Sequence, residues 1–248
     1  FIKMNKTNTE DLVFGIRSVI EAINEGKTIN KIYLQKGLTG DLIKELVILI
    51  HKEKILVQKV PIQKLNHMVK KNHQGVIAMI SPVPYHQLEW LVQDIYERGE
   101  DPFILILDRV KDVRNFGAIS RTAECFGVHA IVLPNKDSAL ITNDAIKTSA
   151  GALFKIPVCK VNSLSSSIDF LKGYGLKIFA CTEKSDTLIN KVEGAGPKAL
   201  IIGSEEDGVD SQLLKISDVS FKIPMIGTIA SLNVSVASGI AIHQLNNS

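Results

Sequence analysis

The chain of 248 residues has few cysteines and no long hydrophobic run. Its cysteines, Cys125, Cys159 and Cys181, lie far apart and have no His or Cys close by in the sequence, so the pattern predicts no metal site. An odd number of dispersed cysteines is typical of a reducing compartment. No apolar run approaches the roughly 20 residues that cross a bilayer. We therefore expect a cytoplasmic protein without a membrane segment.

Other sequence features are missing as well. The first residues lack the apolar core of a signal peptide, and we expect Met4 to be the natural start. No G-x-G-x-x-G follows the first strand of the second half, and no G-x-x-x-x-G-K-[ST] occurs anywhere. These absences argue against ordinary dinucleotide and nucleoside-triphosphate binding.

Positive charge is concentrated in one part of the chain. Residues 1–84 contain 13 Lys/Arg against 7 Asp/Glu, whereas residues 85–248 contain 16 against 19. A basic half of this kind indicates a polyanionic partner, although lysines that merely keep a small domain soluble would look the same.

The first half predicts a small α/β domain. Apolar residues from Leu12 to Ile23 recur at helical spacing, and the stretches KIYLQ, ILVQKV and GVIAMI read as strands with helices between them. Pro82 and Pro84 mark a linker. We place the domain boundaries at residues 4–84 and 85–248.

The second half alternates strands and helices. Its strands FILILD, HAIVLP, IPVCKV, KIFACT and ALIIG are continuous apolar runs, as in a parallel sheet covered on both faces, and VSFKIP adds a short strand. Helices are predicted at 118–126, 144–153, 165–171 and 232–244. This order predicts a doubly wound α/β domain with its ligand at the carboxyl ends of the strands.

Polar residues and glycines gather at three of these strand ends. Asn115 and Gly117 are predicted in a loop before a helix with Arg121 on its first turns, Gly203, Glu205 and Gly208 follow the strand ALIIG, and the third segment runs from Ile223 to Ser235. Each pattern alone would be ordinary, since an Asn-x-Gly is usually a turn and Glu205-Glu206-Asp207 would be a solvated acidic loop. Their joint occurrence, in order, favours a site.

Together the three segments resemble the signature motifs of the SpoU (TrmH-like) RNA ribose 2′-O-methyltransferases. The first half, with FGIRSVIEAI and NHQGVIA, resembles the substrate-binding domain of many members. The resemblance implies a trefoil-knotted (SPOUT-type) parallel-sheet methyltransferase domain, preceded by a small ribosomal-protein L30e-like α/β domain. It also implies a homodimer through the knotted domain, which suits a chain that carries no Asp, Glu, Lys or Arg after Lys222.

The resemblance further implies S-adenosylmethionine as cofactor and ribosomal RNA as partner, with a guanosine of 23S rRNA as the target. It assigns two groups of site residues, the catalytic Asn115, Arg121, Glu205, Ser231 and Asn233 and the cofactor-binding Thr182, Gly203, Gly208, Ile223 and Leu232. We assign Arg17, Lys70, Lys71 and Arg114 to the substrate-binding surface, where basic side chains can neutralise phosphates. Glu206 departs from the glycine that many members have after the motif-two glutamate.

Several alternatives remain open from the sequence. Arginine is a poor base, so either the surroundings of Arg121 weaken its hold on the proton, or Arg121 positions the ribose through an RNA phosphate. Ser231 stands where a helix N-cap would and could serve only that purpose. A tRNA methyltransferase is the main rival function, and a non-catalytic RNA-binding protein is a weaker one, because Arg121 and Asn233 are present.

Overall fold

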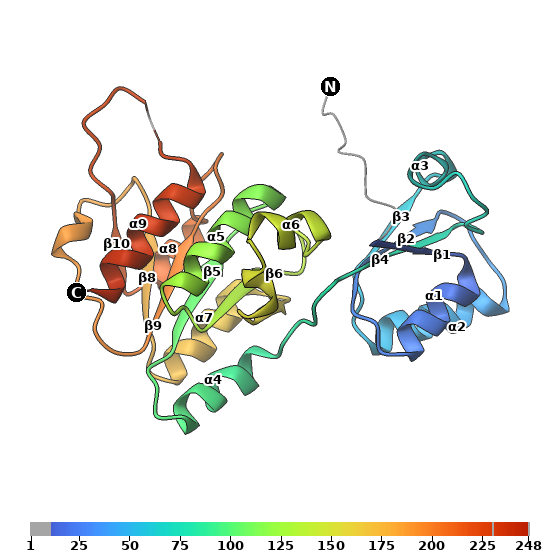
Figure 1. Cartoon of the computed structure of the whole chain (residues 1–248), viewed down its shortest axis with the longest axis horizontal. Coiled ribbons are helices and arrows are strands. Elements are labelled where there is room, and N and C mark those ends of the chain that lie inside the picture. Colours follow the sequence, from blue (N-terminus) through green and yellow to red (C-terminus); the bar gives the residue numbers. More distant parts are fainter. Residues whose placement is uncertain (1–10, 230, 248) are drawn as a thin grey trace. The chain divides into compact units, whose positions relative to one another are not determined.

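The computed structural model describes residues 11–229 and 231–247 (Figure 1). The expected start at Met4 lies outside these residues. The chain divides into two units. One ends at Pro84 and also includes Leu140–Asn143, and the other comprises Tyr85–Ala139 and the chain from Asp144 onward. The division therefore does not follow a single cut in the sequence. The assignment of RNA binding to residues 4–84 and methyl transfer to residues 85–248 stays a prediction.

The first unit contains a mixed four-stranded sheet with the order β1-β4-β2-β3. Strand β4 is antiparallel to β1 and β2, whereas β2 and β3 are parallel. Its elements are β1 (Leu12–Phe14), α1 (Ile16–Asn24), β2 (Ile29–Gln35), α2 (Asp41–Lys52), β3 (Val57–Val60), α3 (Ile62–Met68) and β4 (Val76–Ile80).

Apolar residues cover both faces of this sheet. On one face, Val19 of α1 and Leu46 of α2 are fully buried against Ile32 of β2. On the other face, Leu65 of α3 packs with Ile77 of β4, and Leu140 packs against the same cluster. Leu140 thus contributes to the core of the first unit although it is far away in sequence.

Residues 12–14 form a strand, whereas the sequence pattern predicted that Leu12 begins a helix. Leu12 pairs with Met79 and Phe14 with Ile77 in the antiparallel β1–β4 ladder. Gly15 then takes a φ of 90°, which ends the strand and starts α1 at Ile16. Tertiary pairing with β4 decided between the two structures.

The second unit contains a parallel six-stranded sheet with the order β10-β8-β9-β5-β6-β7. Its strands are β5 (Phe103–Leu107), β6 (Ala130–Pro134), β7 (Val158–Val161), β8 (Lys177–Cys181), β9 (Lys198–Ile202) and β10 (Val219–Phe221). Its helices are α4 (Leu88–Glu97), α5 (Val113–Cys125), α6 (Asn143–Thr148), α7 (Leu164–Gly173), α8 (Ser211–Ile216) and α9 (Val234–Asn246), with short 3₁₀ turns at Ala152–Phe154 and Ile189–Lys191. Only the first residue of α6, Asn143, is counted with the first unit.

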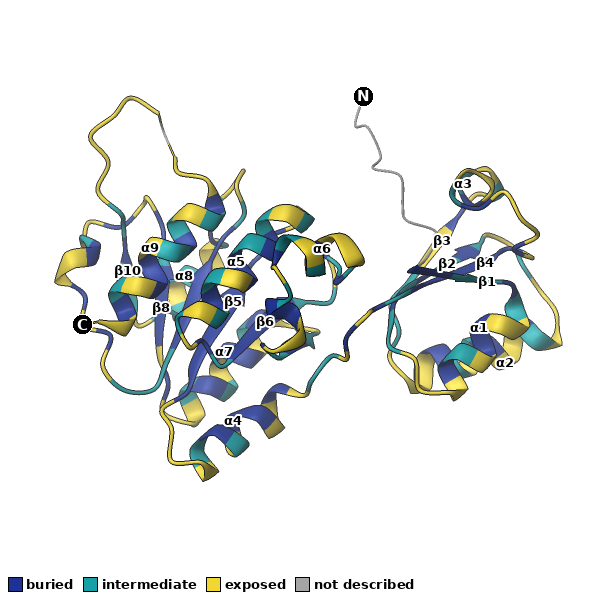
Figure 2. Cartoon of the chain, in the orientation of Figure 1, coloured by how far each residue is buried: buried dark blue, intermediate teal, exposed yellow. Residues whose placement is uncertain are grey.

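Helices cover both faces of this sheet (Figure 2). The central strand β5 is buried over its whole length, and its neighbour β9 is buried from Ala199 onward. Ile104 and Ile106 pack with residues of α4, α7 and α8 in one cluster. Because side chains alternate along a strand, Leu105 and Leu107 face the opposite side, where α5 and α9 lie side by side (Figure 1). The predicted α/β fold with a parallel sheet is confirmed.

The helix predicted at 144–153 is interrupted. Helix α6 ends at Thr148, and the next turn begins only at Ala152. Between them Ala150 and Gly151 have φ values of 51° and 86°, which no α-helix tolerates.

The described residues contain no group of three or more His, Cys, Asp or Glu placed to hold a metal ion. Among the same residues, no helix is both long enough and apolar enough to span a membrane.

Candidate active site

The three polar segments lie at one edge of the parallel sheet. Strands β8, β9 and β5 are neighbours, and β10 pairs with β8. Since all of these strands run in the same direction, their carboxyl ends meet at the same edge. The segments that follow β5, β9 and β10 carry the residues singled out in the sequence.

Helix α5 begins five residues earlier than predicted. Asp112 is its N-cap, and its carboxylate accepts hydrogen bonds from the backbone N–H groups of Arg114 (2.9 Å) and Asn115 (2.8 Å). Asn115 and Gly117 therefore lie in the helix and not in a loop. The cap explains the earlier start, since a carboxylate that satisfies two free N–H groups fixes the first turn.

Gly117 is required by close helix packing. A Cβ atom at this position would lie 2.7 Å from Cβ of Thr148 and 3.0 Å from the carbonyl oxygen of Ala145. Both neighbours belong to α6. The glycine thus lets α5 approach α6 closely. The sequence pattern placed Gly117 in a loop and did not predict this packing.

The segment after β9 forms a closed turn. Ser204 and Gly208 exchange backbone hydrogen bonds of 3.1 Å in both directions, with Glu205, Glu206 and Asp207 between them. A Cβ atom on Gly203 would collide with the backbone of Gly208 and Val209. The closure of this turn therefore requires a glycine at position 203. This requirement comes from the protein's own backbone and does not depend on a ligand.

Three polar side chains join the three segments. The amide nitrogen of Asn115 donates a hydrogen bond to the Glu205 carboxylate, and the amide nitrogen of Asn233 donates to the amide oxygen of Asn115 at 3.2 Å. Helix α5, the turn after β9 and the start of α9 are thereby linked. We call Asn115, Glu205 and Asn233 the polar triad.

Asn233 also caps α9. Its side-chain oxygen accepts hydrogen bonds from the backbone N–H (2.9 Å) and the hydroxyl (2.6 Å) of Ser235. The N-cap is therefore Asn233, and the alternative that placed Ser231 there is wrong. The helix starts at Val234 because the cap residue itself takes a non-helical backbone conformation, with φ −56° and ψ 138°.

A cavity of about 310 Å³ lies beside the polar triad. All five predicted cofactor-binding residues line it, and so do Glu205 and Ser231. Its walls are formed by Cys181, Thr182, Glu183, Ile202, Gly203, Ser204, Glu205, Glu206, Gly208, Ile223, Met225, Ser231, Leu232, Val234 and Ala237.

Cys181 and Glu183 belong to this cavity but were not predicted. Both lie where β8 ends, so the strand-end rule could have found them. Burial, together with the nearby Glu183 carboxylate, raises the pKa of the Cys181 thiol to about 12. The thiol therefore stays neutral at physiological pH, and the wall that it forms is polarisable and uncharged.

Arg121 and Arg114 do not line the cavity. Both are exposed on α5, seven residues apart and therefore on nearly the same side of the helix. Within residues 11–229 and 231–247, the Arg121 guanidinium has no hydrogen-bond or ion-pair partner. It is open to a ligand from solvent.

The predicted substrate-binding residues of the first unit share one edge of its sheet. Arg17 follows β1 in the first turn of α1, and Lys70 and Lys71 precede β4, which is antiparallel to β1. The side-chain oxygen of Gln74 accepts a hydrogen bond from the backbone N–H of Ile16 (3.0 Å) and so joins the two segments. All three cationic side chains are exposed.

Comparison with known proteins identifies the family. The SpoU rRNA Methylase family matches residues 102–243, and the RNA 2′-O ribose methyltransferase substrate-binding family matches residues 12–86. YacO of Bacillus subtilis, assigned by name to the TrmH family of tRNA/rRNA methyltransferases, is 33% identical over 235 residues, which are 95% of this chain and 94% of YacO.

Two solved structures share the fold. An AdoMet-bound rRNA methyltransferase from Sinorhizobium meliloti has a TM-score of 0.59 at 22% identity and covers 95% of this chain and 86% of its own. The TrmH/SpoU tRNA modifying enzyme of A. aeolicus has a TM-score of 0.54 at 29% identity and covers 64% of this chain and 83% of its own. The protein is a member of the SpoU/TrmH family of RNA 2′-O-methyltransferases.

Proposed function

We propose that the protein transfers a methyl group from S-adenosylmethionine to the ribose 2′-hydroxyl of a guanosine in 23S rRNA. The observation that carries the proposal is the cavity at the carboxyl edge of the sheet, with the polar triad beside it. Family membership supports RNA methylation, and the motif resemblance favours the guanosine of 23S rRNA. A cytoplasmic location is part of the same proposal, since an rRNA substrate agrees with it.

The cavity residues fit S-adenosylmethionine. Ile202, Ile223, Leu232 and Val234 offer apolar walls for an adenine ring, and the neighbouring backbone offers N–H and C=O groups. The neutral thiol of Cys181 adds no charge. When bound, this cofactor supplies a methyl group that its sulfonium already activates.

The chain's own residues then have to hold the ribose in line and orient its hydroxyl. The Arg121 guanidinium, unpaired within the described residues, can donate hydrogen bonds to an RNA phosphate and to the ribose together, because its donors form a planar fork. We therefore favour positioning over proton abstraction as the role of Arg121. The Glu205 carboxylate, held by Asn115, offers a fixed acceptor for a hydroxyl of the nucleotide.

The first unit supports RNA recognition. Its sheet, with helices on both faces, is what an L30e-like domain requires. We propose that the edge with Arg17, Lys70 and Lys71 binds phosphates, since the first turn of α1 contains no acidic residue and Glu25 is the C-cap at the other end of that helix. Arg114 would extend phosphate binding to the methyltransferase unit.

The fold details implied by the family also belong to this proposal. A Cβ atom on Gly194, in the segment before β9, would collide with the backbone of Leu245 in α9. So close an approach of the last helix to an earlier segment supports a knotted chain. The trefoil knot itself is part of what we propose.

We further propose a homodimer through α5 and α9. A groove of about 640 Å³ runs between these helices, and its lining includes Thr122, Val236, Gly239 and Ile240 but no Asp, Glu, Lys or Arg among the described residues. Val236 is 50% exposed and Ile240 39% exposed. Interface cores are depleted of charge, so this face suits a second copy of the chain.

Mapping of 2′-O-methyl groups in RNA from cells with and without the gene tests the substrate. The expected result is one guanosine of 23S rRNA that loses its methyl group in the deletion strain and regains it on complementation. Loss of a methyl group from tRNA with unchanged rRNA would replace the rRNA assignment by tRNA. Calorimetric titration of the purified protein with S-adenosylmethionine tests the cofactor separately.

A further inference from the structure

Arg109 occupies a strained position two residues after the end of β5. Its φ of 59° lies in the left-handed region, which residues with a side chain rarely adopt. Its Nε donates to one oxygen of Asp108 and its Nη2 to the other, both at 3.0 Å. Asp108 itself is 4% exposed. The guanidinium is thus fixed by a buried carboxylate on the rim of the sheet.

The other side of the same guanidinium reaches the turn after β9. Nη1 donates to the Asp207 carboxylate at 3.2 Å, and Nη2 donates to the carbonyl oxygen of Gly208 at 3.1 Å. Asp108 adds a third connection to this segment, because its carboxylate accepts a hydrogen bond of 2.8 Å from the backbone N–H of Asp210. Arg109 therefore joins the end of β5 to the turn 204–208, and we call these contacts the Arg109 latch.

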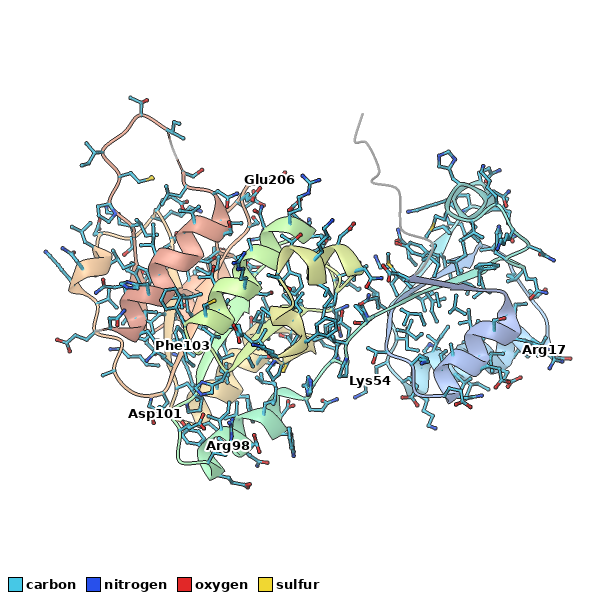
Figure 3. The ribbon with its side chains drawn as sticks, in the orientation of Figure 1. Arg17, Lys54, Arg98, Asp101, Phe103 and Glu206 are labelled. Atoms are coloured by element: carbon cyan, nitrogen blue, oxygen red, sulfur yellow. The ribbon has the colours of Figure 1, made fainter. Side chains whose placement is uncertain are left out.

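The turn held by this latch is part of the candidate active site. Ser204, Glu205, Glu206 and Gly208 line the cavity, and Glu205 belongs to the polar triad. The turn bears three consecutive exposed carboxylates, Glu205, Glu206 and Asp207, which repel one another. Glu206 is labelled in Figure 3. The Arg109 guanidinium opposes that repulsion where the turn closes, because its positive charge pairs with Asp207 and it also donates a hydrogen bond to the carbonyl oxygen of Gly208.

We propose that Arg109 is a positioning residue for methyl transfer, which holds the turn 204–208 in the conformation that forms the cofactor wall and presents Glu205 to Asn115. Arginine suits this role because only its planar fork can bond Asp108 on one side and the turn on the other. Lysine has a point charge on a single nitrogen and cannot bridge both. The proposal rests on the proposed use of S-adenosylmethionine.

The test compares four variants of the full chain, Arg109→Ala, Arg109→Lys, Asp207→Asn and the double variant Arg109→Ala/Asp207→Asn. Arg98→Ala is the matched control, because Arg98 also pairs with two carboxylates, Asp94 and Glu100, and lies at the opposite end of the unit from Glu206 (Figure 3). Calorimetry gives the Kd for S-adenosylmethionine, steady-state kinetics give kcat and both KM values, and thermal unfolding gives Tm.

We expect Arg109→Ala to raise the Kd for S-adenosylmethionine about 10-fold and to lower kcat, with the KM for RNA unchanged. Arg109→Lys should be intermediate. Asp207→Asn, at an exposed position, should raise the Kd about 3-fold without changing Tm. The double variant should match Arg109→Ala, since both changes open the same latch.

Two results would overturn the inference. One is wild-type Kd and kcat in both Arg109→Lys and Asp207→Asn, and the other is strictly additive effects in the double variant. If Arg109→Ala does not fold, these two milder variants still decide the question. The unmodified protein separates this inference from the proposed function, because a wild-type chain that fails to bind S-adenosylmethionine contradicts the function itself.

Discussion

At the scale of single residues, the candidate active site contains side chains that are bonded within the protein and one that is open to solvent. The polar triad of Asn115, Glu205 and Asn233 is bonded within the protein. Arg121 has no such partner within the described residues. A side chain that the fold does not use for its own stability is free to bind RNA, so substitutions of Arg121 and of the triad should have different consequences.

Arg121→Ala should lower kcat for methyl transfer about 100- to 1,000-fold, as removal of one oriented donor does in other enzymes. The Kd for S-adenosylmethionine should stay at the wild-type value, because Arg121 does not line the cavity. Methyl incorporation into rRNA and calorimetry measure the two quantities. Wild-type turnover would refute the assigned role, and Arg98→Ala controls for the loss of one surface charge.

Asn233 has two separable functions, which different replacements should distinguish. Asn233→Ala removes the N-cap of α9 and should cost about 1 kcal/mol of the free energy of unfolding. Asn233→Ser keeps a capping oxygen but is too short to reach Asn115, so stability should be retained while kcat falls about 10-fold. Chemical denaturation and kinetics test this pair, and equal activity of Asn233→Ser and wild type would contradict a role of the triad.

At the scale of elements, the orientation of α5, which carries the first motif, is fixed by contacts with two other helices. One side meets α6 at Gly117, and another packs along α9. The Asp112 cap fixes where the helix begins. The direction of Asn115 toward Glu205 is thus a consequence of helix packing and capping.

Gly117→Ala should therefore disturb both stability and activity. The added methyl group would press on Thr148 and on the backbone of Ala145, and overpacking of this kind costs about 1–3 kcal/mol. Gly173→Ala is the control, because a methyl group on this helical glycine of α7 would meet no described atom within 4 Å apart from its chain neighbours and the nearby backbone of the same helix. Thermal unfolding should show a lowered Tm for the first variant, whereas an unchanged or raised Tm in both would contradict tight α5–α6 packing.

At the scale of the whole molecule, charge is divided between the two units. The net charge is +6 over residues 1–84 and −3 over residues 85–248. The methyltransferase half cannot attract RNA by its overall charge, so the first unit should provide much of the affinity. Arg17 and Lys54 lie at opposite ends of this unit (Figure 3), which allows its two edges to be compared.

Simultaneous replacement of Arg17, Lys70 and Lys71 by Ala should weaken RNA binding and flatten its dependence on salt. The slope of log K against log salt should fall by about 0.7 for each phosphate of single-stranded RNA that the variant no longer neutralises. The Kd for S-adenosylmethionine should not change. The matched control replaces Lys27, Lys52 and Lys54, three exposed lysines at the other edge of the sheet. Equal salt slopes for the two triple variants would contradict the proposed RNA-binding edge.

The order of strands and helices could be predicted from the sequence because hydrophobic periodicity is a local property. The continuous apolar runs predicted strands β5 to β9 to within two residues at either end, as for FILILD and β5, whereas VSFKIP extends further than β10. The strand-end rule also predicted that the candidate site residues would gather at one edge of the sheet, and all five cofactor-binding candidates line one cavity.

Features that depend on partners distant in sequence were decided only by the tertiary structure. Leu12 enters a strand because β4 pairs with it, and Leu140 belongs to the first unit because its apolar contacts are there. The need for Gly203 comes from the backbone of Gly208, and the latch of Arg109 spans 99 positions of the chain. Periodicity reports which side of an element is buried, whereas these contacts depend on which elements the fold brings together.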